Sequence, residues 1–197
     1  MKQTTAQGWK KVRKAALAWL VAVGLALNVG LVTTMPLLAD SPAPEQSIAN
    51  YEVRFMEEMI DHHAMAVMMG ELCLEKAVHE ELRTMCEEII AAQTHEIETM
   101  QSWLQEWYGL SYEPQMKPGD MQQMEKLAAT SGEEFEIMFM EMMIKHHAKA
   151  IKQATKCTQQ AYHDALVDMC ENIIVTQQAE IEQMQTWLCD WYGICKE

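Results

Sequence analysis

Apolar side chains recur at helical spacing in two successive stretches of the chain. They follow steps of three and four residues from 56 to 74, and again from 82 to 104. Continuing the first helix at about 100° per residue would place the second series on nearly the opposite side, so the chain must reverse near Glu75 to His79. The positions are Met56, Met59, Ile60, His63, Ala66, Val67, Gly70 and Leu74 in the first series and Leu82, Cys86, Ile89, Ile90, Gln93, Ile97, Met100 and Leu104 in the second.

The same pattern occurs twice. Residues 55–110 align without a gap with residues 139–194 at an offset of 84 positions, and 29 of the 56 aligned pairs are identical. Two hairpins that bury their apolar stripes against each other predict an all-α fold, a four-helix bundle built from two tandem helical hairpins. The predicted parts are repeat 1 (47–110), a proline-containing linker (111–119), a short helix (121–129) and repeat 2 (131–194).

The first forty residues differ from the rest. A basic start from Lys2 to Lys14 precedes an uncharged apolar stretch from Ala15 to Ala39, and Asp40 is the first acidic residue. This order is typical of a secretory signal peptide over residues 1–39, with an uncleaved membrane anchor as the alternative. In both cases we expect the domain formed by residues 40–197 to be periplasmic or secreted.

The remaining domain is strongly acidic. From Asp40 onward the chain has 10 Lys+Arg against 29 Asp+Glu, a formal charge of −19. Such a surface repels nucleic acid and anionic lipid and concentrates cations, although acidity can also serve only to keep an exported protein soluble. We therefore expect no nucleic-acid partner, and no membrane contact beyond an N-terminal anchor.

Six cysteines in an exported chain should mostly be paired. The first two flank the turn of repeat 1, the next two repeat that arrangement, and the last two straddle the final helix end. We predict three structural disulfides, with reduced thiolates as copper ligands as the alternative. The pairs are Cys73 with Cys86, Cys157 with Cys170, and Cys189 with Cys195.

Core positions of each hairpin bring methionine and histidine together. If the first hairpin turns near residue 78, residues whose numbers sum to about 156 lie side by side, so Gln93 faces His63 and would fix its tautomer. Thioether sulfur and neutral imidazole suit soft ions such as copper(I), with silver(I) as a surrogate; calcium, magnesium and ferric iron prefer oxygen ligands. The predicted pockets are Met56, Met59, His63 and Met100 in repeat 1 and Met140, Met143, His147 and Met184, with Gln177, in repeat 2.

An auxiliary site is predicted beside the first pocket. His62 lies about 100° round the helix from His63, with Met65 and Met69 on the same side. We expect this flank to be the more exposed of the two. In repeat 2, His146 remains but lysine and glutamine replace the two methionines, so we expect the first hairpin to bind more metal.

Two other functions compete with metal binding. Methionines at helical spacing often only fill a core, in which case the chain is a structural or protein-interaction bundle, with Met65, Met68 and Met69 free to receive a partner helix. A di-iron oxidase needs two Glu-x-x-His motifs, but Met59 and Ile60 precede the first histidine pair at that spacing. Sixteen methionines after residue 40 crowd around both His-His pairs, which favours copper(I) without catalysis.

The motifs carry a family resemblance. Met-Ile-x-His-His-Ala (59–64 and 143–148), then Gln-x-x-Glu-Ile-x-x-Met (93–100 and 177–184) and a closing Trp-Leu, resemble the family called domain of unknown function 305, especially its CopM-type copper-binding proteins of cyanobacteria. The resemblance implies a ferritin-like four-helix bundle in the periplasm that sequesters copper(I) or passes it to a copper efflux or delivery protein. The ligands it implies are Met59, His62, His63, Met143, His146 and His147.

Overall fold

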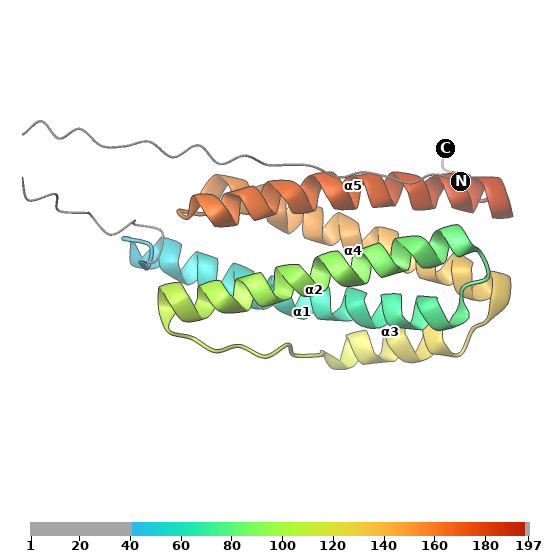
Figure 1. Cartoon of the computed structure of the whole chain (residues 1–197), viewed down its shortest axis with the longest axis horizontal. Helices are drawn as coiled ribbons and strands as arrows, with labels where there is room; N and C mark the ends of the chain where they lie inside the picture. Colours follow the sequence, from blue (N-terminus) through green and yellow to red (C-terminus); the bar gives the residue numbers. More distant parts are fainter. Residues whose placement is uncertain (1–40, 196–197) are drawn as a thin grey trace, which may run out of the picture. The chain divides into compact units, whose positions relative to one another are not determined.

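The computed structural model describes residues 41–195, which form five helices and no strand. The described part of the chain is therefore all-α, as predicted. The signal peptide or anchor predicted for residues 1–39 lies outside the described residues, and none of the helices in 41–195 is apolar enough over its length to cross a membrane. The helices are α1 (Gln46–Lys76), α2 (Glu80–Tyr108), α3 (Pro118–Ala128), α4 (Gly132–Gln160) and α5 (Asp164–Tyr192) (Figure 1).

Each long helix pairs with the next to form a hairpin. The first hairpin consists of α1 and α2, and the second of α4 and α5 (Figure 1). The chain reverses at residues 77–79 and 161–163, and no glycine is needed because both turns keep extended, negative-φ backbone. The hairpins end at Gly109 and Gly193, whose φ angles of 66° and 68° are the left-handed C-cap geometry that glycine accommodates.

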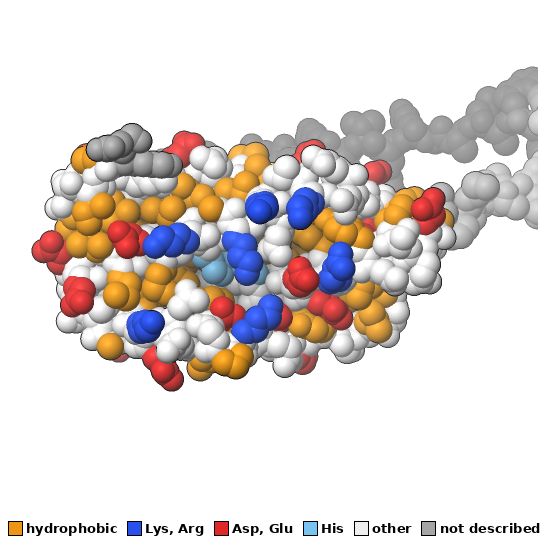
Figure 2. Space-filling model, turned by 180° about the vertical axis from the view of Figure 1, so that it is seen from behind, with side chains coloured by type: hydrophobic (Ala, Val, Ile, Leu, Met, Phe, Trp, Pro, Cys, Tyr) orange, Lys and Arg blue, Asp and Glu red, His pale blue; other side chains and the backbone are white. Residues whose placement is uncertain are grey.

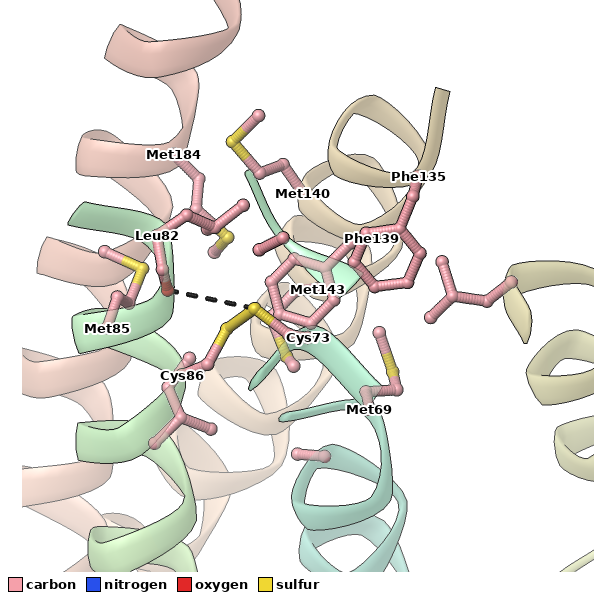
Figure 3. Packing of buried hydrophobic residues seen from close by; sticks show 14 of the residues in the cluster. Met69, Cys73, Leu82, Met85, Cys86, Phe135, Phe139, Met140, Met143 and Met184 are labelled. Carbon is pink, nitrogen blue, oxygen red and sulfur yellow. Dashed lines mark hydrogen bonds between the residues drawn. A yellow bond between two sulfur atoms is a disulfide. The ribbon is translucent and has the colours of Figure 1, made fainter. Parts of the chain in front are cut away.

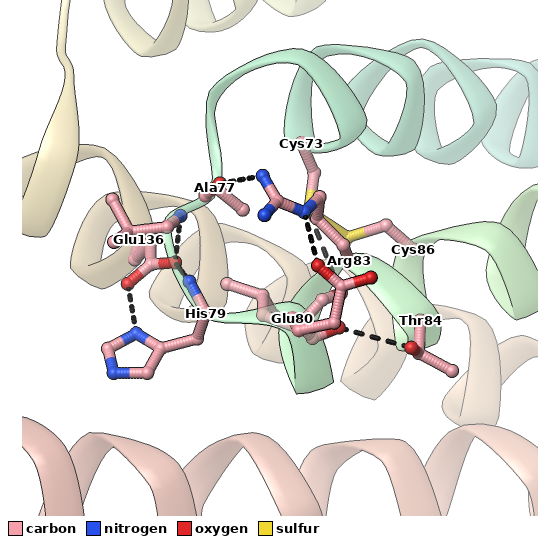
Figure 4. Close-up of a disulfide and its surroundings, with 10 residues drawn as sticks. Cys73, Ala77, His79, Glu80, Arg83, Thr84, Cys86 and Glu136 are labelled. Atoms are coloured by element: carbon pink, nitrogen blue, oxygen red, sulfur yellow. Dashed lines mark hydrogen bonds and ion pairs between the residues drawn. A yellow bond between two sulfur atoms is a disulfide. The ribbon is translucent and has the colours of Figure 1, made fainter.

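The three predicted disulfides are all present. Cys73–Cys86 and Cys157–Cys170 link the two helices of each hairpin close to its turn, and Cys189–Cys195 ties the end of α5 to the following segment. Figure 4 shows the first of them beside the turn, where Arg83 donates a hydrogen bond to the Ala77 carbonyl. No cysteine of the described residues is free, so all six sulfurs form structural crosslinks within the hairpins or at the end of α5.

The two hairpins pack through α1 and α4, with the turn of each at the open end of the other. Glu136, near the start of α4, accepts hydrogen bonds from the backbone of Val78 and His79 in the first turn (2.6 and 2.8 Å) and from His79 Nδ1 (2.7 Å) (Figure 4). It also accepts one from the Tyr192 hydroxyl. The fully buried Glu136 carboxylate therefore holds hairpin 1 to hairpin 2.

The duplicated glutamate makes the reciprocal contact. Glu52 accepts hydrogen bonds from the backbone of Tyr162 (2.7 Å) and His163 (3.0 Å), from His163 Nδ1 (2.7 Å) and from the Tyr108 hydroxyl (2.5 Å). Glu52 and Glu136 occupy equivalent positions of the two repeats. The repeats are thus related by an approximate two-fold axis that passes between α1 and α4.

This arrangement divides the core between the two ends. One cluster joins the turn end of hairpin 1 to the open end of hairpin 2 and includes the Cys73–Cys86 disulfide, Phe135 and Phe139 (Figure 3). The other joins the opposite ends and includes Phe55, Leu104 and Cys157. The two histidine pairs, His62–His63 and His146–His147, lie between these two clusters.

Candidate metal site

His62 of α1 and His146 of α4 lie against each other at the approximate two-fold axis between these helices. Their ring centroids are 3.5 Å apart, with 30° between the ring planes. Their chain neighbours continue the row on both sides: the centroids of His62 and His63 are 6.1 Å apart, and those of His146 and His147 are 6.2 Å apart. The duplication thus brings four imidazoles from two helices into one row.

The central pair lines a cavity of about 280 Å³ between α1, α4 and the start of α3. Met65, Met69 and Met142 line the same cavity, so three thioethers lie beside the two imidazoles. Charged side chains and one glutamine form the rest of its wall: Glu58, Asp61, Lys117, Asp120, Gln123, Lys145 and Lys149. Figure 2 shows a histidine recessed on this face, with lysine or arginine side chains around it.

The auxiliary flank is slightly more exposed than the core pocket, in which Met56, Met59, His63 and Met100 are 0% exposed, but it is still buried. His62 is 7% exposed, Met65 6% and Met69 0%, because α4 packs over this flank of α1 and α3 lies beside it. His62 and His146 were predicted to belong to separate sites, whereas both line one cavity. The greater metal content expected for the first hairpin stays a prediction. The lysine that replaces one methionine in repeat 2, Lys149, lies on the wall of that shared cavity.

The ring nitrogens of the two central imidazoles are buried and have no hydrogen-bond partners. Neither Nδ1 nor Nε2 of His62 has a partner among the described residues, and the same holds for His146. Burial, reinforced by the neighbouring His146, holds the pKa of His62 far below its usual range. Burial and then His147 lower the pKa of His146 in the same way. Both rings are therefore neutral at physiological pH, the form that can donate a lone pair to a metal ion.

The outer imidazoles each lie against a carboxylate that was missed as a functional residue. His63 Nε2 and Glu96 Oε2 are 2.6 Å apart in a hydrogen bond. His147 Nε2 and Glu180 Oε2 are 2.7 Å apart, in poorer hydrogen-bond geometry. The remaining ring nitrogen, Nδ1 of both histidines, is buried and unpartnered.

The predicted hydrogen bond from Gln93 to His63 is not formed. Gln93 is buried, but its Oε1 has no partner, and Glu96, one helical turn further along α2, takes its place. The signal for Glu96 was present in the sequence, because the Glu of the Gln-x-x-Glu motif occurs in both repeats on the same helical face as the glutamine.

The remaining predicted ligands are deep in the core. Met56, Met59 and Met100 are fully buried in one cluster, and Met140, Met143 and Met184 are fully buried in the other (Figure 3). His63 and His147 are fully buried as well. Within residues 41–195, no three His, Cys, Asp or Glu side chains form a group that could hold a metal ion.

The sequence matches the family described as Domain of unknown function (DUF305) over residues 52–188. The chain belongs to the DUF305 family. Its fold is similar to that of CopM in the Cu(I)-bound form, with a TM-score of 0.65, 32% sequence identity and coverage of 72% of this chain and 98% of CopM. The Ag-bound form obtained by co-crystallization gives the same values, and the Cu(II)-bound form gives a TM-score of 0.66 with 32% identity, covering 72% of this chain and 97% of that one.

More distant DUF305 proteins share the fold. A DUF305 fragment from Deinococcus radiodurans is 23% identical, with a TM-score of 0.64 and coverage of 75% of this chain and 97% of that one. A DUF305 protein from Streptomyces coelicolor is 21% identical, with a TM-score of 0.63 and coverage of 71% and 91%. No functionally curated protein sequence matches the chain.

Proposed function

We propose that this DUF305 protein binds copper(I), with silver(I) as a surrogate, at the row of four histidines and the methionines beside it. The observation that carries the proposal is the His62–His146 pair, whose four buried ring nitrogens lack partners while three thioethers line the same cavity. Burying a polar group without a partner is costly, and a soft ion held by these nitrogens and sulfurs would offset that cost. CopM, which is 32% identical, has been crystallised with Cu(I), Cu(II) and Ag.

The carboxylates would act through the outer histidines. A metal-binding imidazole commonly donates its second N–H to a carboxylate, which fixes the tautomer and the ring orientation. The contacts of His63 with Glu96 and of His147 with Glu180 leave Nδ1 as the available donor atom. The buried methionines of each core cluster, Met56, Met59 and Met100 and their copies Met140, Met143 and Met184, would supply further thioethers to His63 and His147.

We place this binding outside the cytoplasm and without catalysis. Three disulfides support a periplasmic or secreted location, because reducing compartments disfavour such bonds. The protein would sequester copper, contribute to copper resistance, or pass the ion to an efflux or delivery protein. The pairing of α1 with α2 and of α4 with α5 supports assignment to the ferritin-like four-helix bundles.

A copper(I) competition titration of the disulfide-intact domain tests the proposal. We expect at least about one copper(I) per chain, and a large loss of affinity when His62 and His146 are both changed to leucine. Met121→Leu is the matched control, because Met121 is exposed and lies outside the cavity. A stoichiometry well below one, or equal affinity in the histidine variant and the control, would overturn the proposal.

A further inference from the structure

Four lysines form a stripe along the exposed face of α4. Lys145, Lys149, Lys152 and Lys156 follow steps of four, three and four residues, which places them on one side of the helix, and all four are exposed. Lys145 and Lys149 line the mouth of the His62–His146 cavity, and Lys117 lines it from the other side. Figure 2 shows basic side chains gathered on this face around the recessed histidine.

The linker holds Lys117 at this position. Asp61 Oδ1 accepts hydrogen bonds from Tyr112 Oη (3.0 Å) and from the Gln115 backbone (2.7 Å), which ties the segment before α3 to α1. Lys117 immediately precedes α3. The cavity mouth is thus bordered by lysines that belong to two separate parts of the chain.

The stripe is not a requirement of the repeat. The equivalent positions of α1 are Asp61, Met65, Met68 and Leu72, none of which is basic, although the two repeats fold alike. Lys145, Lys149, Lys152 and Lys156 make no ion pair with any other described residue. Half of the 10 Lys+Arg after residue 40 therefore lie in the stripe or, as Lys117, on the wall of the cavity that the stripe borders, in a domain whose formal charge is −19.

We propose that the lysine stripe of α4 is the docking surface for an acidic segment of a partner protein. The stripe runs from Lys145 to Lys156, eleven positions apart, which is about 16 Å along the helix. This is longer than a small anion and matches about five residues of extended chain. Charges on the protein surface act over roughly the 8 Å Debye length. Nucleic acid and anionic membranes are much larger than this, so they would also come within range of the acidic surface around the stripe and be repelled by it. A short acidic segment contacts the stripe alone.

The position of the stripe links docking to the metal site, and this step rests on the proposed function. A partner segment laid along α4 would end beside the cavity mouth at Lys145 and Lys149, next to Met142 and His146. The partner is then placed to give or receive the ion without a long diffusive step.

Fluorescence anisotropy with a labelled hexaglutamate peptide tests the docking surface on the disulfide-intact, metal-free domain. We expect binding that weakens with salt and that falls roughly threefold to tenfold in Lys152→Glu. Lys152 does not line the cavity, so copper(I) stoichiometry in this variant should be unchanged. The matched control adds the same negative charge at exposed positions of α2, as Ala92→Glu with Gln105→Glu, and should bind the peptide like the parent.

Each alternative occupant gives a distinct result. Equal loss in the α2 control would show that only net charge matters, and it would overturn the proposal. Binding to phosphatidylserine vesicles or inorganic phosphate with no binding to hexaglutamate would also overturn it, as would self-association that Lys152→Glu abolishes. Unchanged copper(I) affinity in the variant with both His62 and His146 changed to leucine, with peptide binding to the lysine stripe intact, would count against the metal site alone.

Discussion

Glu52 of the first repeat accepts a 2.7 Å hydrogen bond from Nδ1 of His163 in the turn of the second. The same carboxylate satisfies two backbone N–H groups of that turn, and His163 stacks on Trp107 with ring centroids 3.8 Å apart. Glu136, His79 and Trp191 repeat the arrangement at the other end, with a stacking distance of 3.9 Å. Each turn is therefore stabilised by the opposite hairpin.

Glu52→Gln should lower the free energy of unfolding by about 3 kcal/mol, because an amide cannot accept all the hydrogen bonds that the buried carboxylate accepts. Urea denaturation followed by circular dichroism would measure the change. Glu71→Gln, at an exposed position of the same helix, should have almost no effect. A loss of similar size in both variants would contradict the role assigned to Glu52.

The two buried glutamates also predict acid sensitivity. Burial alone would raise the pKa of Glu52 and of Glu136, but hydrogen bonds from a tyrosine, a histidine and backbone N–H groups outweigh it and lower both below 4.5. The folded state therefore favours the charged carboxylates, whose contribution is complete above pH 4.5 and is lost as the pH falls through the lowered values. The urea concentration at the midpoint of unfolding should decrease as the pH is lowered from about 5 to about 3, and this decrease should be less steep in Glu52→Gln. An unchanged slope in the variant would count against this assignment.

In the metal-free protein, the central histidines His62 and His146 should lower the free energy of unfolding. His62→Leu removes two buried ring nitrogens that have no hydrogen-bond partner and leaves an apolar side chain of similar size. We expect the free energy of unfolding of the metal-free domain to stay level or rise by about 1 kcal/mol, while copper(I) affinity falls. A marked destabilisation of the metal-free variant would show that His62 serves the core instead.

The duplication made much of the fold predictable. The turn near residue 78 and the pairing of Cys73 with Cys86 and of Cys157 with Cys170 followed from helical periodicity and the equivalence of the copies. The pairing of one hairpin with the other did not, because an internal repeat fixes the form of each unit but not the face on which two units meet. For this reason the shared cavity of His62 and His146 was predicted as two separate sites.

The register error at His63 has a geometric cause. Side chains of a helix tilt toward its N-terminus, which is away from the turn in α1 and toward the turn in α2. Each α1 residue therefore meets an α2 partner that lies farther from the turn than its own level. The observed partners, His63 with Glu96 and Cys73 with Cys86, both sum to 159 instead of 156. That shift moves the partner of His63 from Gln93 to Glu96.

Replacing Cys73 and Cys86 by alanine should destabilise the domain by about 3 kcal/mol, through the larger entropy of the unfolded chain and the space left in the core. Both sulfurs are fully buried among Leu82, Met143 and their neighbours (Figure 3). Replacing Cys189 and Cys195 should cost less, because that bond closes a shorter loop at the C-terminal end. Thermal denaturation of the two double variants would compare them, and equal costs would contradict the prediction.

Glu96→Gln should weaken copper(I) binding by roughly tenfold to a hundredfold without changing its stoichiometry. Glu96 holds His63 through a 2.6 Å contact to Nε2, so the amide would still fill the space but would stabilise the N–H form of the ring less strongly. Glu98→Gln, at an exposed position two residues away, is the matched control. Because a positioning role changes the ring and not only the affinity, the histidine 15N chemical shifts of the metal-free protein should report an altered His63 tautomer in Glu96→Gln alone. Equal affinities in the two variants, with unchanged shifts, would show that Glu96 merely neutralises charge beside the core.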